Sequence, residues 1–177
     1  MNVQGEKALL LSRYGLDCKR YNDEYEDVTW ETCTVRTWLN DTFYNSAFTG
    51  EQQDKIVTTR INTPDNAMYG TEGGNDTYDN IFFLSKEEAD KYFPKGEGIE
   101  NKYRATNATA YAQAQGASAL ESSKWYNGNC LWDLRSPGMV HNLVVRVQED
   151  GYVGSSGGSV YGKHGAVRPA LWVNLTP

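Results

Sequence analysis

Histidine and cysteine are scarce in this sequence. The chain has 2 histidines and 3 cysteines among 177 residues. Two histidines, His141 and His164, are too few for a three-histidine metal site. Cys18, Cys33 and Cys130 lack the Cys-x-x-Cys spacing of a zinc knuckle, and their odd number does not indicate a disulfide framework. We therefore expect buried free thiols and no metal ligands. A disulfide between Cys18 and Cys33 is an alternative only in an oxidising compartment.

Long hydrophobic runs and clusters of basic residues are also missing. The longest aliphatic run, residues 8–11, is far too short for a membrane span or a signal-peptide core. The 17 Lys and Arg are outnumbered by 23 Asp and Glu, and the net charge of −6 disfavours binding to nucleic acid or to an anionic membrane. Localisation stays open, because an upstream segment of the native gene would allow display on a cell surface or a phage particle.

The composition is that of a folded chain. Hydrophobic residues make up 39% and aromatic residues 12%, which is enough to fill a core. The length fits a single domain, residues 1–177, because one core of this size already buries most of the chain's surface. The 12 Tyr and 5 Trp suit packed interiors and recognition surfaces alike, since each combines an apolar body with a polar tip.

Hydrophobic spacing predicts an α+β fold, with helices in the first two thirds and hairpins in the last. Ser85 and Glu88 form a capping-box pattern, and Asp150-Gly151 is a hairpin turn signal. We expect helices at 29–48, 51–56, 86–92 and 106–115; strands at 7–13, 57–61, 81–84, around Leu143 to Val147, and at 166–175 with an interruption at Pro169; and loops at 17–27, 62–80, 116–129 and 154–158.

Catalytic patterns are weak throughout. A nucleophilic pair of Cys130 with His141 or His164 is a formal alternative, but nothing in the local sequence supports it. The acidic clusters at 23–27 and 87–90 are typical of solvated surfaces. The segment 70–76 matches neither a phosphate loop nor an EF-hand, so a structural calcium ion there is a minor alternative to having no cofactor.

Three motifs, however, resemble one bacterial family. In chain order they are the first motif, Trp-Glu-Thr-Cys-Thr-Val-Arg-Thr-Trp-Leu-Asn at 30–40, the second, Trp-Asp-Leu-Arg-Ser-Pro-Gly at 132–138, and the third, Gly-Ala-Val-Arg-Pro-Ala-Leu-Trp at 165–172. Residues 79–88 also resemble that family's middle strand-to-helix step. The family is the formylglycine-generating-enzyme-like branch of the C-type lectin fold. The resemblance implies a C-type-lectin-like α+β domain with a small antiparallel sheet closed by its C-terminal strands.

The same resemblance argues against carrying over the catalysis of that branch. The formylglycine-generating enzyme uses two late cysteines, one of which would follow the Gly-x-Arg step of the motif. Here Pro169 stands at that position, and only Cys130 lies in this region. The iron-dependent sulfoxide synthases of the branch need three histidines. The resemblance also extends to variable proteins of diversity-generating retroelements, which hold ligand-contacting residues on a fixed frame. Asp133, at a commonly apolar position, and Ala166, an extra residue, depart from the motifs.

Our hypothesis is a non-catalytic module that binds a protein or a glycan; the alternatives are an enzyme of the same branch with a nonstandard site, or a structural or adhesive domain of a larger surface protein. Loops between the motifs are rich in small, amide, aromatic and imidazole side chains, as adaptable binding loops are. The predicted ligand-binding residues are Trp125, Tyr126, Asn127, Asn129, Asp133, Met139, His141, Asn142, Ser155, Tyr161, Lys163 and His164. The predicted structural residues are Trp38, Trp132, Arg135, Arg168 and Trp172, because a buried arginine needs carboxylate or carbonyl partners.

Overall fold

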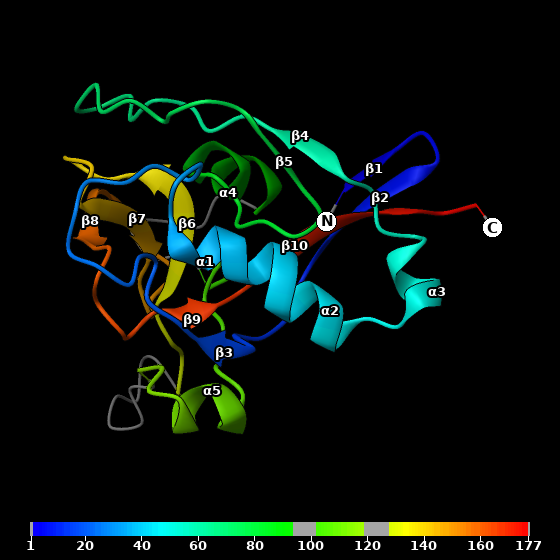
Figure 1. Ribbon diagram of the computed structural model, residues 1–177. Helices are drawn as coiled ribbons and strands as arrows, with labels where there is room; N and C mark the ends of the chain where they lie inside the picture. Colours follow the sequence, from blue (N-terminus) through cyan, green and yellow to red (C-terminus); the bar gives the residue numbers. More distant parts are fainter. Residues whose placement is uncertain (1, 94–101, 119–127, 177) are drawn as a thin grey trace.

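Three separate sheets and a few short helices make up the structure, a computed structural model that describes residues 2–93, 102–118 and 128–176 (Figure 1). The fold is α+β, as predicted. In Figure 1 the largest sheet lies at the left, and the sheet that joins the two ends of the chain lies at the right. Within the described ranges no helix is long and apolar enough to cross a membrane.

The first and last strands share a three-stranded sheet. It consists of β1 (Asn2–Gln4), β2 (Lys7–Leu11) and β10 (Ala170–Asn174), in the order β1-β2-β10. Both pairings are antiparallel, with Leu10 opposite Leu171. The aliphatic run of β2 therefore packs along the end of the third motif, which joins the two termini of the chain.

The largest sheet has five strands in the order β3-β9-β6-β7-β8. They are β3 (Asp17–Cys18), β9 (Ala166–Val167), β6 (Trp132–Pro137), β7 (Leu143–Val147) and β8 (Val153–Ser159). The β6–β9 pairing is parallel, and none of the sheets closes on itself. The expected closed antiparallel sheet is therefore wrong: Pro169 divides the predicted last strand, and its two halves, β9 and β10, join different sheets.

Helices lie between residues 34 and 114 of the described chain. α1 (Thr34–Trp38) continues through a π-helical segment η1 (Leu39–Phe43) into α2 (Tyr44–Ala47). The predicted start at residue 29 is too early, because the Thr29 carbonyl accepts the Thr32 and Cys33 amides in a preceding turn. The other helices are α3 (Gly50–Gln53), α4 (Lys86–Tyr92) and α5 (Ala110–Ala114). The predicted capping box of α4 is confirmed, with Ser85 and Glu88 exchanging hydrogen bonds.

Several local predictions are wrong. Residues 17–18 and 77–79 fall in predicted loops but form the strands β3 and β5 (Thr77–Asp79). Residues 154–158 were expected to be a loop but belong to strand β8. Residues 81–84 were expected to be a strand, but within them only Phe82 pairs, in a single bridge to Ala170. The hairpin turn at Asp150-Gly151 is confirmed, because Gly151 has φ +83° and the Gln148 amide donates to the Tyr152 carbonyl.

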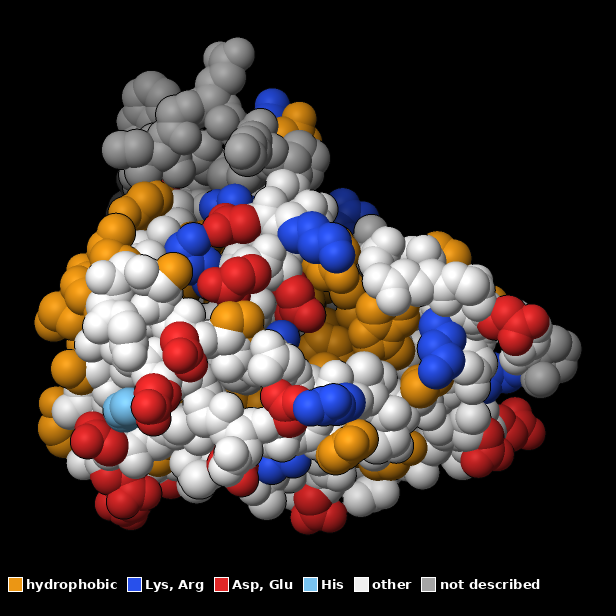
Figure 2. Space-filling view, turned by 90° about the horizontal axis from the view of Figure 1, so that it is seen from above, with side chains coloured by type: hydrophobic (Ala, Val, Ile, Leu, Met, Phe, Trp, Pro, Cys, Tyr) orange, Lys and Arg blue, Asp and Glu red, His pale blue; other side chains and the backbone are white. Residues whose placement is uncertain are grey.

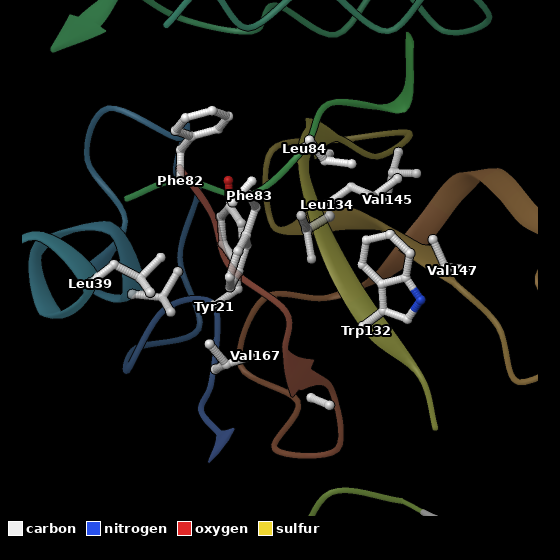
Figure 3. Packing of buried hydrophobic residues seen from close by; sticks show 14 of the residues in the cluster. Tyr21, Leu39, Phe82, Phe83, Leu84, Trp132, Leu134, Val145, Val147 and Val167 are labelled. Carbon is white, nitrogen blue, oxygen red and sulfur yellow. The ribbon is translucent and has the colours of Figure 1, made fainter. Parts of the chain in front are cut away.

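One cluster of buried hydrophobic residues forms the core (Figure 3). It gathers side chains from the first third (Tyr21, Leu39), the middle (Phe83) and the last third (Trp132, Val145) of the chain. The rings of Trp30 and Phe83 lie 5.5 Å apart, and those of Phe93 and Trp132 lie 6.3 Å apart. The three sequence motifs therefore meet in the same interior.

Candidate functional site

A long connection crosses one end of the five-stranded sheet. It comprises residues 62–76, which join β4 (Thr59–Ile61) to β5 (Thr77–Asp79), and we call it the strap. In Figure 1 it runs along the top of the molecule towards the side of β7 and β8. Its composition, rich in Asn, Asp, Gly and Thr, explains why it forms neither helix nor strand.

One asparagine attaches the strap to the sheet. The Asn66 side-chain amide donates to the carbonyls of Pro137 (2.9 Å), Gly138 (3.1 Å) and Ser155 (2.8 Å). These carbonyls belong to the end of β6, the residue after it, and β8. Asn66 is 7% exposed, so its amide would be unsatisfied if these acceptors were removed.

Further contacts join the strap to the turn at 139–142. The Thr71 hydroxyl donates to the Met139 carbonyl at 2.8 Å, and the His141 Nε2 atom lies 3.0 Å from the Glu72 carbonyl oxygen. At Gly73 a Cβ would lie 1.9 Å from the Thr63 carbonyl oxygen, so only glycine fits there. The strap and the turn therefore form one continuous surface.

Large hydrophobic side chains are exposed on this surface. Met68 is 69% exposed, Tyr69 43%, Met139 46% and Val140 45%. We call these four residues the strap surface. In Figure 2 hydrophobic side chains line the left edge, on the side to which the strap extends, and a second hydrophobic group lies near the centre among acidic and basic side chains. Contiguous exposed apolar side chains are a feature of interaction sites.

A pocket of about 340 Å³ opens beside the strap surface. Its wall is mixed, with apolar groups from Met68 and the fully buried Val145, hydroxyls from two serines, and charges from the start of α4. The residues that line it are Asn66, Ala67, Met68, Lys86, Glu87, Ser136, Val145 and Ser155. Both motif residues (Ser136) and strap residues thus contribute to the pocket.

The predicted ligand-binding residues fall into separate regions. Met139, His141, Asn142 and Ser155 lie at the strap end of the sheet, where β6 ends. Lys163 and His164 lie at the opposite end, just before β9, because Ala166 pairs with Trp132 at the start of β6.

Tyr161 lies beside the strap end, because the amide of the preceding Val160 donates to the Asn142 carbonyl at 3.0 Å. Its ring carries the Arg20 guanidinium at 3.8 Å. Asn129 donates to the Glu149 carbonyl at 3.0 Å. The predictions for Trp125, Tyr126 and Asn127 lie outside the described residues.

Asp133 does not lie on a surface, contrary to expectation. It is 3% exposed and accepts a hydrogen bond from Arg146 Nε at 2.6 Å. Burial raises the pKa of its carboxyl group, although the Arg146 charge acts in the opposite direction. A Cβ at Gly165 would lie 2.6 Å from an Asp133 oxygen, and one at Gly158 would lie 2.4 Å from Arg146 Nη1. The two glycines leave space for a buried ion pair.

The two motif arginines are buried with oxygen partners. Arg135 donates to the carbonyls of Phe83 (2.7 Å) and Asn62 (2.8 Å) and forms an ion pair with Glu88. Arg168 donates to the carbonyls of Ser12 (3.0 Å) and Arg104 (2.9 Å) and lies over the Trp132 ring at 4.6 Å. Burial lowers the pKa of Arg168 to about 10. Trp132 is fully buried, and Trp38 and Trp172 pack half-buried against the core.

The first motif is fastened to the middle of the chain by polar residues that the sequence did not single out. Asp79 accepts hydrogen bonds from Trp30 Nε1 (2.8 Å), Arg36 Nε (2.7 Å) and the Thr77 hydroxyl (2.7 Å). The side-chain oxygen of Asn40 accepts the amides of Asn80 (2.7 Å) and Ile81 (3.1 Å). Their spacing in the sequence is too long for any local pattern to reveal these contacts.

The thiols do not form a nucleophilic site. All three cysteines are free and buried, and the Cys130 thiol lies 3.3 Å from the Thr106 carbonyl oxygen that it can donate to. Burial raises the pKa of Cys130 to about 12, so its thiolate is scarce at neutral pH. The carboxylate of Asp76, in the segment considered for calcium, accepts from Arg60 and Asn62. Within the described ranges no group of three or more His, Cys, Asp or Glu could hold a metal.

Comparison with known families gives one match. A family described as a domain of unknown function, DUF6273, matches residues 5–175. The chain belongs to this family. The match spans all three motifs, the strap and the pocket, so these features lie within the family's domain. No curated protein and no solved structure matches the chain.

Proposed function

We propose that this member of the family is a non-catalytic module that binds a protein ligand through the strap surface. The observation that carries the proposal is the exposure of Met68, Tyr69, Met139 and Val140 on segments held in place by buried polar contacts. Methionine adapts its shape to a partner, and tyrosine offers a large contact at a low entropy cost. Apolar side chains of this kind favour a protein ligand over a glycan.

The contrast between buried motif residues and the exposed turn that connects them supports the proposal. Trp132, Arg135 and Arg168 are buried in the frame, whereas the turn between the motifs is exposed. A turn that does not fill the core can change its sequence at little cost in stability.

We therefore also propose a C-type-lectin-like scaffold whose turns are diversified, as in variable proteins of diversity-generating retroelements. A reverse-transcriptase gene beside a near-copy of the segment encoding residues 125–168, differing mainly at adenines, would support this part; a locus without both would contradict it.

A peptide selection tests the binding role. Random peptides displayed on phage are selected on the whole chain and then compared on two variants. The first replaces the strap surface residues by serine (Met68, Tyr69, Met139 and Val140), and the matched control replaces Tyr25 and Tyr111, which are 63% and 60% exposed, by serine. We expect the selected peptides to lose at least tenfold in affinity on the first variant and to bind the control as they bind the original chain.

The selection also has an opposite outcome. Peptides that bind both variants equally would contradict the strap surface as the binding site. Circular dichroism and thermal unfolding of both variants show that each is folded, which we expect because exposed positions rarely contribute more than a few tenths of a kcal/mol each. Selection of a glycan from an array, with no enriched peptide, would also overturn the proposal.

A further inference from the structure

The pocket beside the strap surface has a shape and a charge that suit one class of group. We propose that it receives a lysine or arginine side chain of the protein partner, with the aliphatic stem along Ala67 and Met68 and the cationic head at Glu87. This inference rests on the proposed function, because it assigns an anchor residue to the same ligand.

The size and the apolar wall of the pocket fit a long side chain. Its volume of about 340 Å³ is roughly ten times the share of one water molecule in the liquid. Ala67 and Met68 of the strap contribute exposed apolar surface, and Val145 of β7, which also borders the pocket, is fully buried. Lysine and arginine place their methylene stems along such surfaces while the charged head remains at the rim.

The charge at the rim favours a cation. Asp90 pairs with both Lys86, at 2.6 Å, and Arg104, at 2.7 Å, so its carboxylate is already occupied by two cations. Glu88 is compensated by Arg135. Glu87 is exposed and, among the described residues, has no ion-pair partner. Glu87 is thus the rim carboxylate that is open to a new cation, on a chain whose net charge of −6 attracts basic partners.

The amide donors beside the pocket are already used, which disfavours an anion. The Asn66 amide is engaged by three carbonyls. The Lys86 backbone amide donates to the Ser136 hydroxyl at 2.9 Å, and the Glu88 amide donates to the Ser85 hydroxyl at 3.1 Å. A carboxylate or phosphate in the pocket would therefore meet Glu87 while finding few free donors.

Small model compounds test the assignment on the whole chain. N-acetyl-arginine methylamide, its neutral counterpart from norleucine and its acidic counterpart from glutamate are titrated at low salt and followed by backbone amide NMR. We expect the arginine compound to bind best and to shift the signals of Met68, Lys86 and Ser155. Replacement of the exposed Glu87 (Glu87→Gln) should weaken this binding about threefold, as expected for one exposed charge pair. The matched control Glu51→Gln, at an exposed position of α3 on the far side of the molecule in Figure 1, should not.

Other outcomes overturn the assignment. These are equal binding of the norleucine compound, tighter binding of the glutamate compound, shifts confined to other faces, or no effect of Glu87→Gln. The inference and the proposed function fail in different ways. Selected peptides that need the strap surface but ignore Glu87→Gln would overturn the pocket assignment alone, whereas peptides that do not need the strap surface would overturn the proposed function.

Discussion

At the scale of single residues, buried polar groups with several partners join parts of the chain that are distant in sequence. Asp79 joins the first motif to the middle of the chain, Arg135 joins the second motif to α4 and the strap, and Arg168 joins the third motif to the segment before α5. A buried charge that loses its partners is costly. The motif residues are therefore explained by stability, and the ligand surface that we propose lies elsewhere.

Asp79 offers the sharpest test of this framework. Its side chain is fully buried, and the partner Arg36 is 23% exposed. Replacement Asp79→Ala should reduce the free energy of unfolding by about 3 to 5 kcal/mol, because it leaves the Trp30 indole N–H and the Arg36 guanidinium without their acceptor. Urea denaturation measures the loss. Asp76→Ala, which removes the exposed pair with Arg60, is the control and should have a much smaller effect; equal effects would contradict the role assigned to Asp79.

The buried thiols make a second prediction, which separates a binding module from a thiol enzyme. Burial raises the pKa of both Cys33 and Cys130 to about 12 from a usual 9. At pH 8 the folded chain should react with a thiol reagent such as Ellman's reagent only as fast as it unfolds, and the denatured chain should release three equivalents at once. Rapid labelling of Cys130 in the folded chain would contradict this.

The same burial makes stability depend on pH. Since the pKa of each of these two thiols is higher in the folded than in the unfolded chain, their contribution to stability is intact below pH 9 and is lost as the pH rises towards 12.

At the scale of elements, the strap is held to the sheet mainly by side-chain and backbone polar contacts. Asn66→Ala would leave three carbonyls without the amide that now donates to them. We expect a loss of about 2 to 3 kcal/mol and faster cleavage within residues 62–76 in limited proteolysis followed by mass spectrometry. The control Asn75→Ala removes one exposed contact with Glu31 and should leave the cleavage rate unchanged. Equal protection of the Asn66 variant would show that other contacts hold the strap.

Two elements show why local patterns fail. Residues 81–84 look like a strand, yet their backbone groups bond elsewhere: Asn40 accepts the Ile81 amide, and Arg135 donates to the Phe83 carbonyl. Strand β8 looks like a loop because its Ser and Gly residues have low β propensity. It pairs because the hairpin turn aligns it with β7. Position 158 needs a glycine because a Cβ there would collide with the Arg146 guanidinium.

At the scale of the whole molecule, the α+β class, the capping box of α4 and the hairpin turn could be predicted, because each depends on neighbours in sequence. The strap surface could not. Asn66 bonds to carbonyls 71, 72 and 89 residues away, and no periodicity in residues 62–80 indicates that contact. Of the ligand residues predicted from composition, Met139 to Asn142 and Ser155 lie at the strap end, whereas Asp133 is buried and Lys163 and His164 lie at the opposite end of the sheet.

The central claim is that the ligand binds at the strap end of the five-stranded sheet. The most direct measurement is backbone amide NMR of the isotope-labelled chain titrated with a peptide from the selection. The account predicts that the largest shift changes fall on residues 66–71, 139–142 and 155. The largest changes at α5 and residues 163–164, or on the outer face of β2 and β10, would contradict it.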